Sequence, residues 1–229
     1  MPDRLDMAIA LMKQNKFSEA IPIFISLIEA DSEDWSLYYM VGQCYRFLDN
    51  ITEAVQFLSK SAHLNPNNAH IFLALGIAHQ LAEEYELAIV TLTQAISLDP
   101  MLFQAYNSLG LTYSKNSQFR EALEWYSRAA EGIVTAVGNA VLKDREKCYV
   151  DINSNGENNR LVLPYVLGKT HETLRVDPMY STVKNNMGLC LMKLGDLVSA
   201  REQFRESIEF IPDGYNYPDP FRHLESIEE

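Results

Sequence analysis

The chain has 229 residues, and 47% of them are hydrophobic, which is enough to bury a sizeable core and too many for a disordered chain. The 31 acidic and 19 basic residues give a formal net charge of −12, which argues against nucleic acids and anionic membranes as partners. No stretch reaches the ~18–20 apolar residues of a membrane span, the N-terminus does not resemble a signal peptide, and the three cysteines form no Cys-x-x-Cys pair. We therefore expect a cytoplasmic protein.

A pair of small residues, twelve positions apart, recurs along the chain. Its copies are Ala8/Ala20, Gly42/Ala54, Gly76/Ala88, Gly110/Ala122 and Gly188/Ala200. Consecutive copies among the first four begin 34 residues apart, and the last follows after a further 78. Apolar residues flank each pair at spacings of three and four, as in amphipathic helices. Small side chains let two antiparallel helices approach to the short end of the ~8–10 Å packing range. The sequence therefore predicts a row of helical hairpins.

Alignment on these pairs divides most of the chain into repeats that cover residues 1–34, 35–68, 69–102, 103–136 and 181–214. Asn65-Pro66, Asp99-Pro100 and Ile211-Pro212 are expected to end second helices, because the residue before proline avoids the helical conformation. Gly195 is expected to separate the two helices of the last repeat.

The segment between the fourth and fifth repeats, residues 137–180, is predicted to be irregular. The fourth repeat has Val134 where a proline would end its second helix, so we expect one long helix from about Phe119 to Lys147. A polar stretch then interrupts, and a further helix is expected from Pro164 to the Asp177-Pro178 step.

The last residues, 215–229, are predicted to contain a short helix that covers the end of the row. Asp219 and Pro220 have the residue types of an N-cap and a first turn. Phe221, Leu224 and Ile227 are expected to form its apolar face.

The order of tyrosine, leucine-glycine, tyrosine, alanine, aromatic, alanine and proline in the third and fourth repeats resembles the tetratricopeptide repeat family, over about three quarters of the chain. This resemblance implies an all-α fold: a right-handed superhelical solenoid of tetratricopeptide helical hairpins, with an irregular insertion before the last repeat. It implies four repeats in 1–136, an insertion in 137–180, a fifth repeat in 181–214 and a capping helix and tail in 215–229.

The resemblance also implies that the first helices line a concave groove that binds a partner. The residues at the groove positions are Leu5, Ile9, Met12, Tyr39, Gln43, Arg46, Leu73, Ile77, Gln80, Asn107, Leu111, Lys115, Asn185, Leu189, Met192 and Lys193. Most are apolar, and the amides among them can bond to a ligand backbone. The lysine and asparagine set with which some family members hold a terminal carboxylate is absent.

Two alternatives are left open for the groove. Its apolar residues either face a ligand or pack between neighbouring repeats. The cations near its rim, Lys13, Arg46, Lys115 and Lys193, either serve a ligand or complement the negative ends of the first helices, worth ~0.3–1 kcal/mol each.

A weak metal-site candidate lies in the insertion. Asp151, Asn153, Asn155 and Gly156 match the first half of an EF-hand calcium loop, but Val162 stands where a carboxylate is needed. An Asn-Gly turn in a short hairpin is the preferred interpretation.

No other pattern indicates catalysis or a cofactor. His79 replaces a tyrosine and is expected to be a hydrogen-bonded core histidine. Cys44 and Cys190 occupy equivalent repeat positions and are expected to pack in the core. No catalytic or nucleotide-binding motif is present, so we expect no enzyme and no cofactor.

The sequence thus favours a protein–protein interaction scaffold, adaptor or assembly chaperone that binds an apolar peptide or amphipathic helix, with an acidic flank, in its groove. The alternative is a self-assembling structural subunit, a homo-oligomer that associates through the apolar run from Met7 to Met12 in its first helix.

Overall fold

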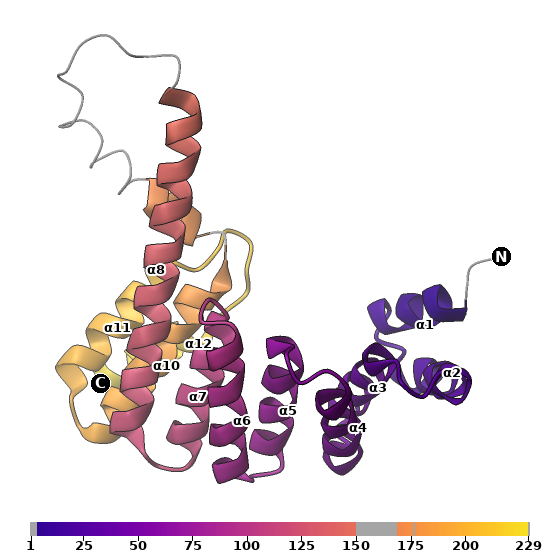
Figure 1. The fold of residues 1–229 in the computed structure, drawn as a ribbon. Coiled ribbons are helices and arrows are strands. Elements are labelled where there is room, and N and C mark those ends of the chain that lie inside the picture. The colour runs from indigo at the N-terminus through magenta and orange to yellow at the C-terminus, as the bar shows by residue number, and fades with distance from the viewer. Residues whose placement is uncertain (1–3, 150–168, 176, 229) are drawn as a thin grey trace. The chain divides into compact units, whose positions relative to one another are not determined.

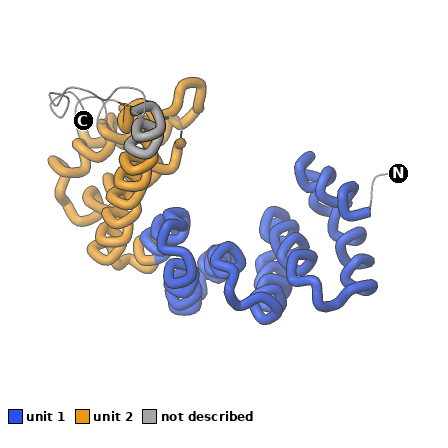
Figure 2. The backbone as a smooth tube through the Cα atoms, turned by 45° about the horizontal axis from the view of Figure 1, so that its top comes forward, with its two compact units in different colours: residues 1–112 blue, residues 113–229 orange. Residues whose placement is uncertain are grey.

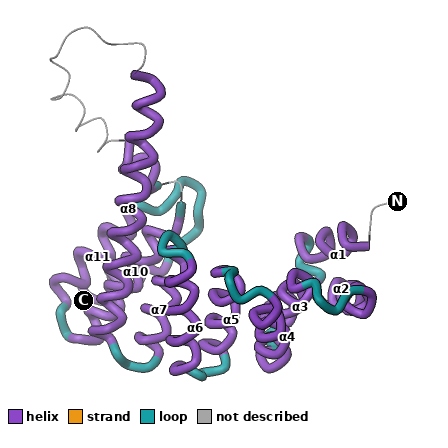
Figure 3. Tube along the Cα trace, in the orientation of Figure 1, coloured by secondary structure: helices purple, strands orange, loops and turns teal. Residues whose placement is uncertain are grey.

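The structure is a computed structural model that describes residues 4–149, 169–175 and 177–228, without the side chains of 142–149 and 228. All regular elements in these ranges are helices, as predicted (Figure 3). The chain divides into two compact units, residues 1–112 and 113–229 (Figure 2). The boundary falls inside α7, where the repeat pattern of the sequence continues without interruption.

The helices follow the predicted hairpins in chain order (Figure 1). The first unit contains α1 (Arg4–Lys13), α2 (Phe17–Ala30), α3 (Trp35–Phe47), α4 (Ile51–Leu64), α5 (Ala69–Leu81), α6 (Tyr85–Leu98) and most of α7 (Phe103–Lys115). The second contains α8 (Phe119–Tyr149), a helical stretch over 169–174, α10 (Pro178–Leu194), α11 (Leu197–Glu209) and α12 (Asp219–Glu228).

The small pairs are buried where the two helices of a hairpin meet. Ala8, Ala20, Ala54, Ala88, Ala122 and Ala200 are fully buried. A Cβ on Gly42 would lie 2.6 Å from Cγ of Leu58, and one on Gly76 would lie 2.6 Å from Cγ of Leu92. Both distances are far below van der Waals contact, so the steric role predicted for these two glycines is confirmed.

The turn between the helices of a hairpin has one backbone conformation throughout. Asn15, Asp49, Glu83 and Ser117 have φ angles of 60–61°. The equivalent residue of the last repeat is Gly195, with φ of 82°. A left-handed residue therefore reverses the chain at the same repeat position each time. Glycine adopts this conformation without steric cost, and asparagine and aspartate tolerate it better than Glu83 and Ser117 do.

The long helix expected after Gln118 is present. α8 extends from Phe119 to Tyr149, against the expected Phe119–Lys147. Ala129, Ala130 and Ile133 are buried along it, and α8 contacts α10 within the second unit. Asp177 caps α10 by accepting a hydrogen bond from the Met179 amide (2.8 Å), and Pro178 is its first residue.

The C-terminal helix exists, but the face expected to pack was wrong in part. Asp219 is the first residue of α12, and the carbonyl of Pro218 accepts from the Arg222 amide (3.2 Å). Phe221 is 48% exposed, whereas Pro220 is among the fully buried side chains. The ring of His223 lies 5.4 Å from that of Phe204 on α11. Pro220 and His223 therefore anchor α12 where Phe221 was expected to do so.

Candidate binding surface

The acidic residues of the described helices are segregated. The first helices α3, α5, α7 and α10 contain no aspartate or glutamate, and α1 contains only Asp6. Every second helix contains carboxylates, as do most of the described turns. In a chain with net charge −12, this distribution leaves the first helices neutral or weakly basic. The pattern can be read from the sequence once the helix bounds are known, but we did not predict it.

The predicted groove residues fall into both compact units. Lys115, Asn185, Leu189, Met192 and Lys193 belong to residues 113–229, and the rest belong to residues 1–112. We define the first-helix surface as the predicted residues of the first unit, apart from Gln80, which is buried. It consists of Leu5, Ile9, Met12, Tyr39, Gln43, Arg46, Leu73, Ile77, Asn107 and Leu111.

The apolar residues of this surface are all partly buried. Leu5, Ile9 and Met12 pack against a core cluster that includes Phe24 and Val41. Tyr39 and Leu73 pack in the same way against a second core cluster, most of which comes from α4 and α5. Each side chain therefore shares its surface between the core and solvent, which is the arrangement of a residue that supports the fold and still offers apolar area to a ligand.

Two of the predicted amides are turned into the protein. Gln80 is 4% exposed, and its Nε2 donates to the Ser108 carbonyl (3.0 Å) and to Oγ1 of Thr112 (2.7 Å), which links α5 to α7. Asn185 is 2% exposed, and its Oδ1 lies 2.9 Å from Nδ1 of His223 on α12. A buried amide needs such partners, so the expectation that these two face a ligand is corrected.

A hydrogen-bonded row of side chains runs along α3. Nε2 of Gln43 donates to the Tyr39 hydroxyl (2.9 Å), and Nε of Arg46 donates to Oε1 of Gln43 (2.8 Å). The three residues are spaced by four and three positions, so they lie on one face of the helix. Arg46 also lies with Cζ 4.4 Å from the centre of the Phe47 ring. Burial lowers the pKa of the Arg46 guanidinium, and the neighbouring Tyr39 acts in the opposite direction.

The remaining rim cations have a different environment. Lys13, Lys115 and Lys193 are exposed and lie in the last turns of α1, α7 and α10. This position fits the interpretation that they complement the negative helix ends. Arg46 is the partly buried member of the predicted set of four.

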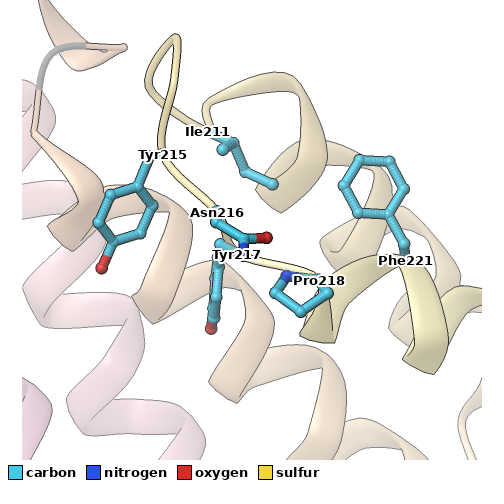
Figure 4. Close-up of a pocket in the computed structure, with 6 residues that line it drawn as sticks. All are labelled: Ile211, Tyr215, Asn216, Tyr217, Pro218 and Phe221. Atoms are coloured by element: carbon cyan, nitrogen blue, oxygen red, sulfur yellow. The ribbon is translucent and has the colours of Figure 1, made fainter.

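A surface hollow in the second unit was missed by the sequence reasoning. It has a volume of about 390 Å³ and lies between the loop after α11 and the start of α12 (Figure 4). Its lining consists of Ile211, Tyr215, Asn216, Tyr217, Pro218 and Phe221. The rings of Tyr215 and Tyr217 are 6.2 Å apart and Tyr215 is 50% exposed. The signal available in the sequence was the aromatic run between Pro212 and Pro220.

His79, Cys44 and Cys190 are buried, as the sequence predicts. The histidine expectation is confirmed, because His79 is 9% exposed with Nδ1 2.6 Å from Oε2 of Glu84. Cys44 and Cys190 are buried free thiols, as expected. Burial raises the pKa of Cys44 to about 11 and also raises that of Cys190.

The calcium candidate, Asp151, Asn153 and Asn155, lies outside the described residues. Within the described part of the chain, no three acidic, histidine or cysteine side chains are grouped closely enough to hold a metal ion. No helix in that part combines the length and apolar character needed to span a bilayer.

Comparison with known families gives matches to repeats of one kind. Models described as tetratricopeptide repeat match residues 5–69 and 103–140, and a model described as TPR repeat matches residues 81–117.

The curated relatives are longer than the matched region. Small glutamine-rich tetratricopeptide repeat-containing protein 2 of Saccharomyces cerevisiae is 28% identical over 141 residues, which cover 57% of this chain and 39% of that protein. BBSome complex member BBS4 of Bos taurus is 25% identical over 117 residues, which cover 51% of this chain and 22% of that protein. The chain therefore matches less than half the length of each.

Solved structures with the same fold cover nearly the whole chain. MamA from Desulfovibrio magneticus RS-1 has a TM-score of 0.66 at 17% identity, and the match covers 90% of this chain and 92% of that chain. YrrB, described as a TPR protein with an unusual peptide-binding site, has a TM-score of 0.62 at 18% identity, with 99% and 91% covered. At such identities the likeness establishes the fold alone.

Proposed function

Because the chain belongs to the tetratricopeptide repeat family, we propose that it is a protein–protein interaction scaffold, adaptor or assembly chaperone. Its ligand is an apolar peptide or amphipathic helix that lies on the first-helix surface. Affinity comes from burial of the ligand's apolar side chains, and Tyr39, Gln43 and Asn107 orient its polar groups. The proposal assigns no reaction and no cofactor to the chain, and it places the protein in the reducing cytoplasm, which fits its free buried thiols.

One observation carries this proposal: the first helices combine partly exposed apolar side chains with an almost complete absence of carboxylates. Binding of an apolar ligand is most favourable where the ligand covers no charged groups, because covering a charge costs desolvation free energy. The second helices differ as a set, because each of them carries at least one carboxylate, whereas α1 is the one described first helix that does. A structurally similar protein described as having a peptide-binding site supports the same class of ligand.

The test is affinity capture with a variant that places charge on the first-helix surface. Leu73→Asp with Leu111→Asp removes two apolar anchors on α5 and α7, and truncation of a central anchor commonly costs ~2 kcal/mol or more. We expect partner capture, read by mass spectrometry, to fall below a tenth of the wild-type yield, a factor that corresponds to about 1.4 kcal/mol.

The chain offers a matched control on a second helix. Leu87 and Val90 on α6 are 52% and 66% exposed, so Leu87→Asp with Val90→Asp introduces the same charge on the opposite helix of a hairpin. This control should leave capture unchanged.

Circular dichroism must show that the surface variant stays folded. If it unfolds, Ile77→Lys replaces it, because a lysine stem can remain on the apolar surface while its ammonium reaches water. A folded surface variant that still captures every partner, or a control variant that loses capture equally, contradicts the proposal.

A second candidate function, self-association through α1, is favoured by Met7, which is 54% exposed. Most of the neighbouring apolar run packs against the core, so Met7 is the residue to change. If α1 forms a homo-oligomer, sedimentation velocity should give a dimer or larger species that Met7→Glu converts to a folded monomer. A wild-type monomer at tens of micromolar removes this candidate.

A further inference from the structure

Arg46 is held in a fixed orientation from two sides. Its Nε donates to Gln43, which in turn donates to the Tyr39 hydroxyl. Its guanidinium lies against the Phe47 ring, and the Phe47 ring stacks on Phe17 of α2 at 4.9 Å with an angle of 9° between the planes. An arginine that is already ordered loses less conformational freedom when it binds a ligand.

Arg46 has no carboxylate partner within the described part of the chain. The ion pairs found there involve His79, Lys169, His171 and Lys184. Burial lowers the pKa of the Arg46 guanidinium, and the neighbouring Tyr39 offsets part of this effect. A partly buried cation without a counter-charge is unexpected in a chain with 31 acidic residues.

The fifth repeat contains a cation, Lys184, whose contacts stabilise the fold and can be compared with those of Arg46. Lys184 on α10 lies 5.4 Å from the centre of the Tyr180 ring, which resembles the position of Arg46 against Phe47. Its Nζ, however, lies 3.0 Å from Oε2 of Glu206 on α11. The charge of Lys184 is therefore balanced internally, whereas Arg46 has no such carboxylate among the described residues.

The donor groups of this side chain match a carboxylate. The guanidinium has five N–H donors, and the bond to Gln43 uses the one on Nε. The two Nη atoms hold the other four, in the planar arrangement that binds both oxygens of a carboxylate. The Tyr39 hydroxyl accepts from Gln43, so its own hydrogen can be donated to a second acceptor.

We propose that Arg46, positioned by Gln43 and Tyr39, binds an aspartate or glutamate carboxylate of the peptide that occupies the first-helix surface. The ligand is therefore an acidic amphipathic segment of a partner protein, with apolar side chains on α1 and α5 and its carboxylate on α3. This inference rests on the proposed function. Charge complementarity decides between the occupants, since Asp6 is the single carboxylate on the described first helices and the remainder of the chain is acidic.

The test starts from a library of random displayed peptides selected on the full-length protein. We expect the recovered peptides to combine leucine, isoleucine or phenylalanine with aspartate or glutamate. One recovered peptide is then measured by fluorescence anisotropy beside its own Glu→Gln variant. Arg46→Gln should weaken the acidic peptide about tenfold and leave the Glu→Gln peptide unchanged, a coupling of about 1.4 kcal/mol. Arg46→Lys should give an intermediate loss, because it keeps the charge but not the planar fork.

The matched control is Lys60→Gln, which removes the same charge from α4 of the same unit. Lys60 also lies over an aromatic ring, with Nζ 5.9 Å from the centre of Tyr38. We expect less than a twofold effect from it, since it is not on a first helix. The loss caused by Arg46→Gln should shrink as salt is raised, because charge pairing is screened.

The outcomes separate the two proposals. If Leu73→Asp abolishes peptide binding but Arg46→Gln resembles Lys60→Gln, the carboxylate site is wrong and the binding surface stands. If Leu73→Asp has no effect on any recovered peptide, or if no peptide is recovered, the surface is wrong as well. A synthetic peptide of residues 219–229 is measured in parallel; tight, Arg46-dependent binding of it would make a second copy of this chain the occupant and overturn the partner assignment.

Discussion

Gly188 offers the sharpest test of how the hairpins are held together. Helix propensity alone predicts that Gly188→Ala stabilises the protein, whereas close helix packing predicts that it destabilises it. A Cβ at this position would lie 2.4, 2.6 and 2.8 Å from three ring atoms of Phe204. Ordinary contacts between carbon atoms are ~3.5–4.0 Å, so the ring would have to retreat by about 1 Å. Phe204 is fully buried and its ring also faces His223 of α12, so it has little room to do so.

The magnitude follows from two opposing contributions. Alanine in place of glycine inside a helix gains about 1 kcal/mol in propensity. Overpacking a core contact costs typically ~1–3 kcal/mol. Because three ring atoms would lie under 3 Å from the added Cβ, we expect a steric cost in the upper part of that range, about 2–3 kcal/mol. Gly188→Ala should therefore lower the free energy of unfolding by about 1–2 kcal/mol and Tm by roughly 2–8 °C.

Gly138 in α8 is the matched control, since the nearest neighbour of an added Cβ is Oγ1 of Thr170 at 3.9 Å. Gly138→Ala should therefore raise stability by about 0.5–1 kcal/mol. Urea denaturation followed by circular dichroism measures both variants, and Phe204→Leu in the Gly188→Ala background should recover part of the loss. If Gly188→Ala is as stable as wild type, close approach of the two helices is not what fixes the hairpin, and the reasoning fails.

Two further predictions concern the turns and the thiols. Glu83→Gly should raise the free energy of unfolding by up to about 1 kcal/mol in urea denaturation, because a left-handed conformation costs a non-glycine residue ~1–2 kcal/mol and glycine recovers most of it. Gly195→Ala should lower the free energy of unfolding, and a change of the same sign in both variants would refute the argument. In a Cys148→Ser background, a thiol-specific reagent at a pH of about 8 should modify Cys44 and Cys190 only after denaturant is added, since both are buried. A pKa of about 11 also leaves Cys44 roughly 0.1% ionised at this pH. Rapid labelling of the folded protein would contradict the burial.

The hairpins could be predicted from sequence because a steric requirement is recorded directly in residue size. A small residue is needed where two helices touch, so the positions of Gly42 and Ala54 locate the contact from the sequence alone. The length of α8 was predictable for a similar reason, since its apolar stripe continues past Val134 without a helix-breaking residue.

The polar residues of the candidate site were harder to place because their roles depend on distant partners. The repeat position of Gln80 is that of a groove residue, yet Thr112, supplied by the next repeat, turns its amide inward. Asn185 is turned inward by His223, which comes from α12 and has no equivalent in the other repeats. Arg46 is distinguished by the absence of a carboxylate partner among the described residues, and residue spacing in the sequence does not reveal such an absence.

The continuity of α8 has a consequence for how the protein comes apart. In a row of separate hairpins, unfolding can stop at any loop, because each repeat contacts only its neighbours. α8 offers no such stopping point over its 31 residues, a length of about 46 Å at 1.5 Å per residue. Its contacts with α10 join the same helix to the last hairpin. The amides of α8 and α10 should therefore exchange with solvent in one cooperative opening, whereas those of α1 and α2 can open on their own.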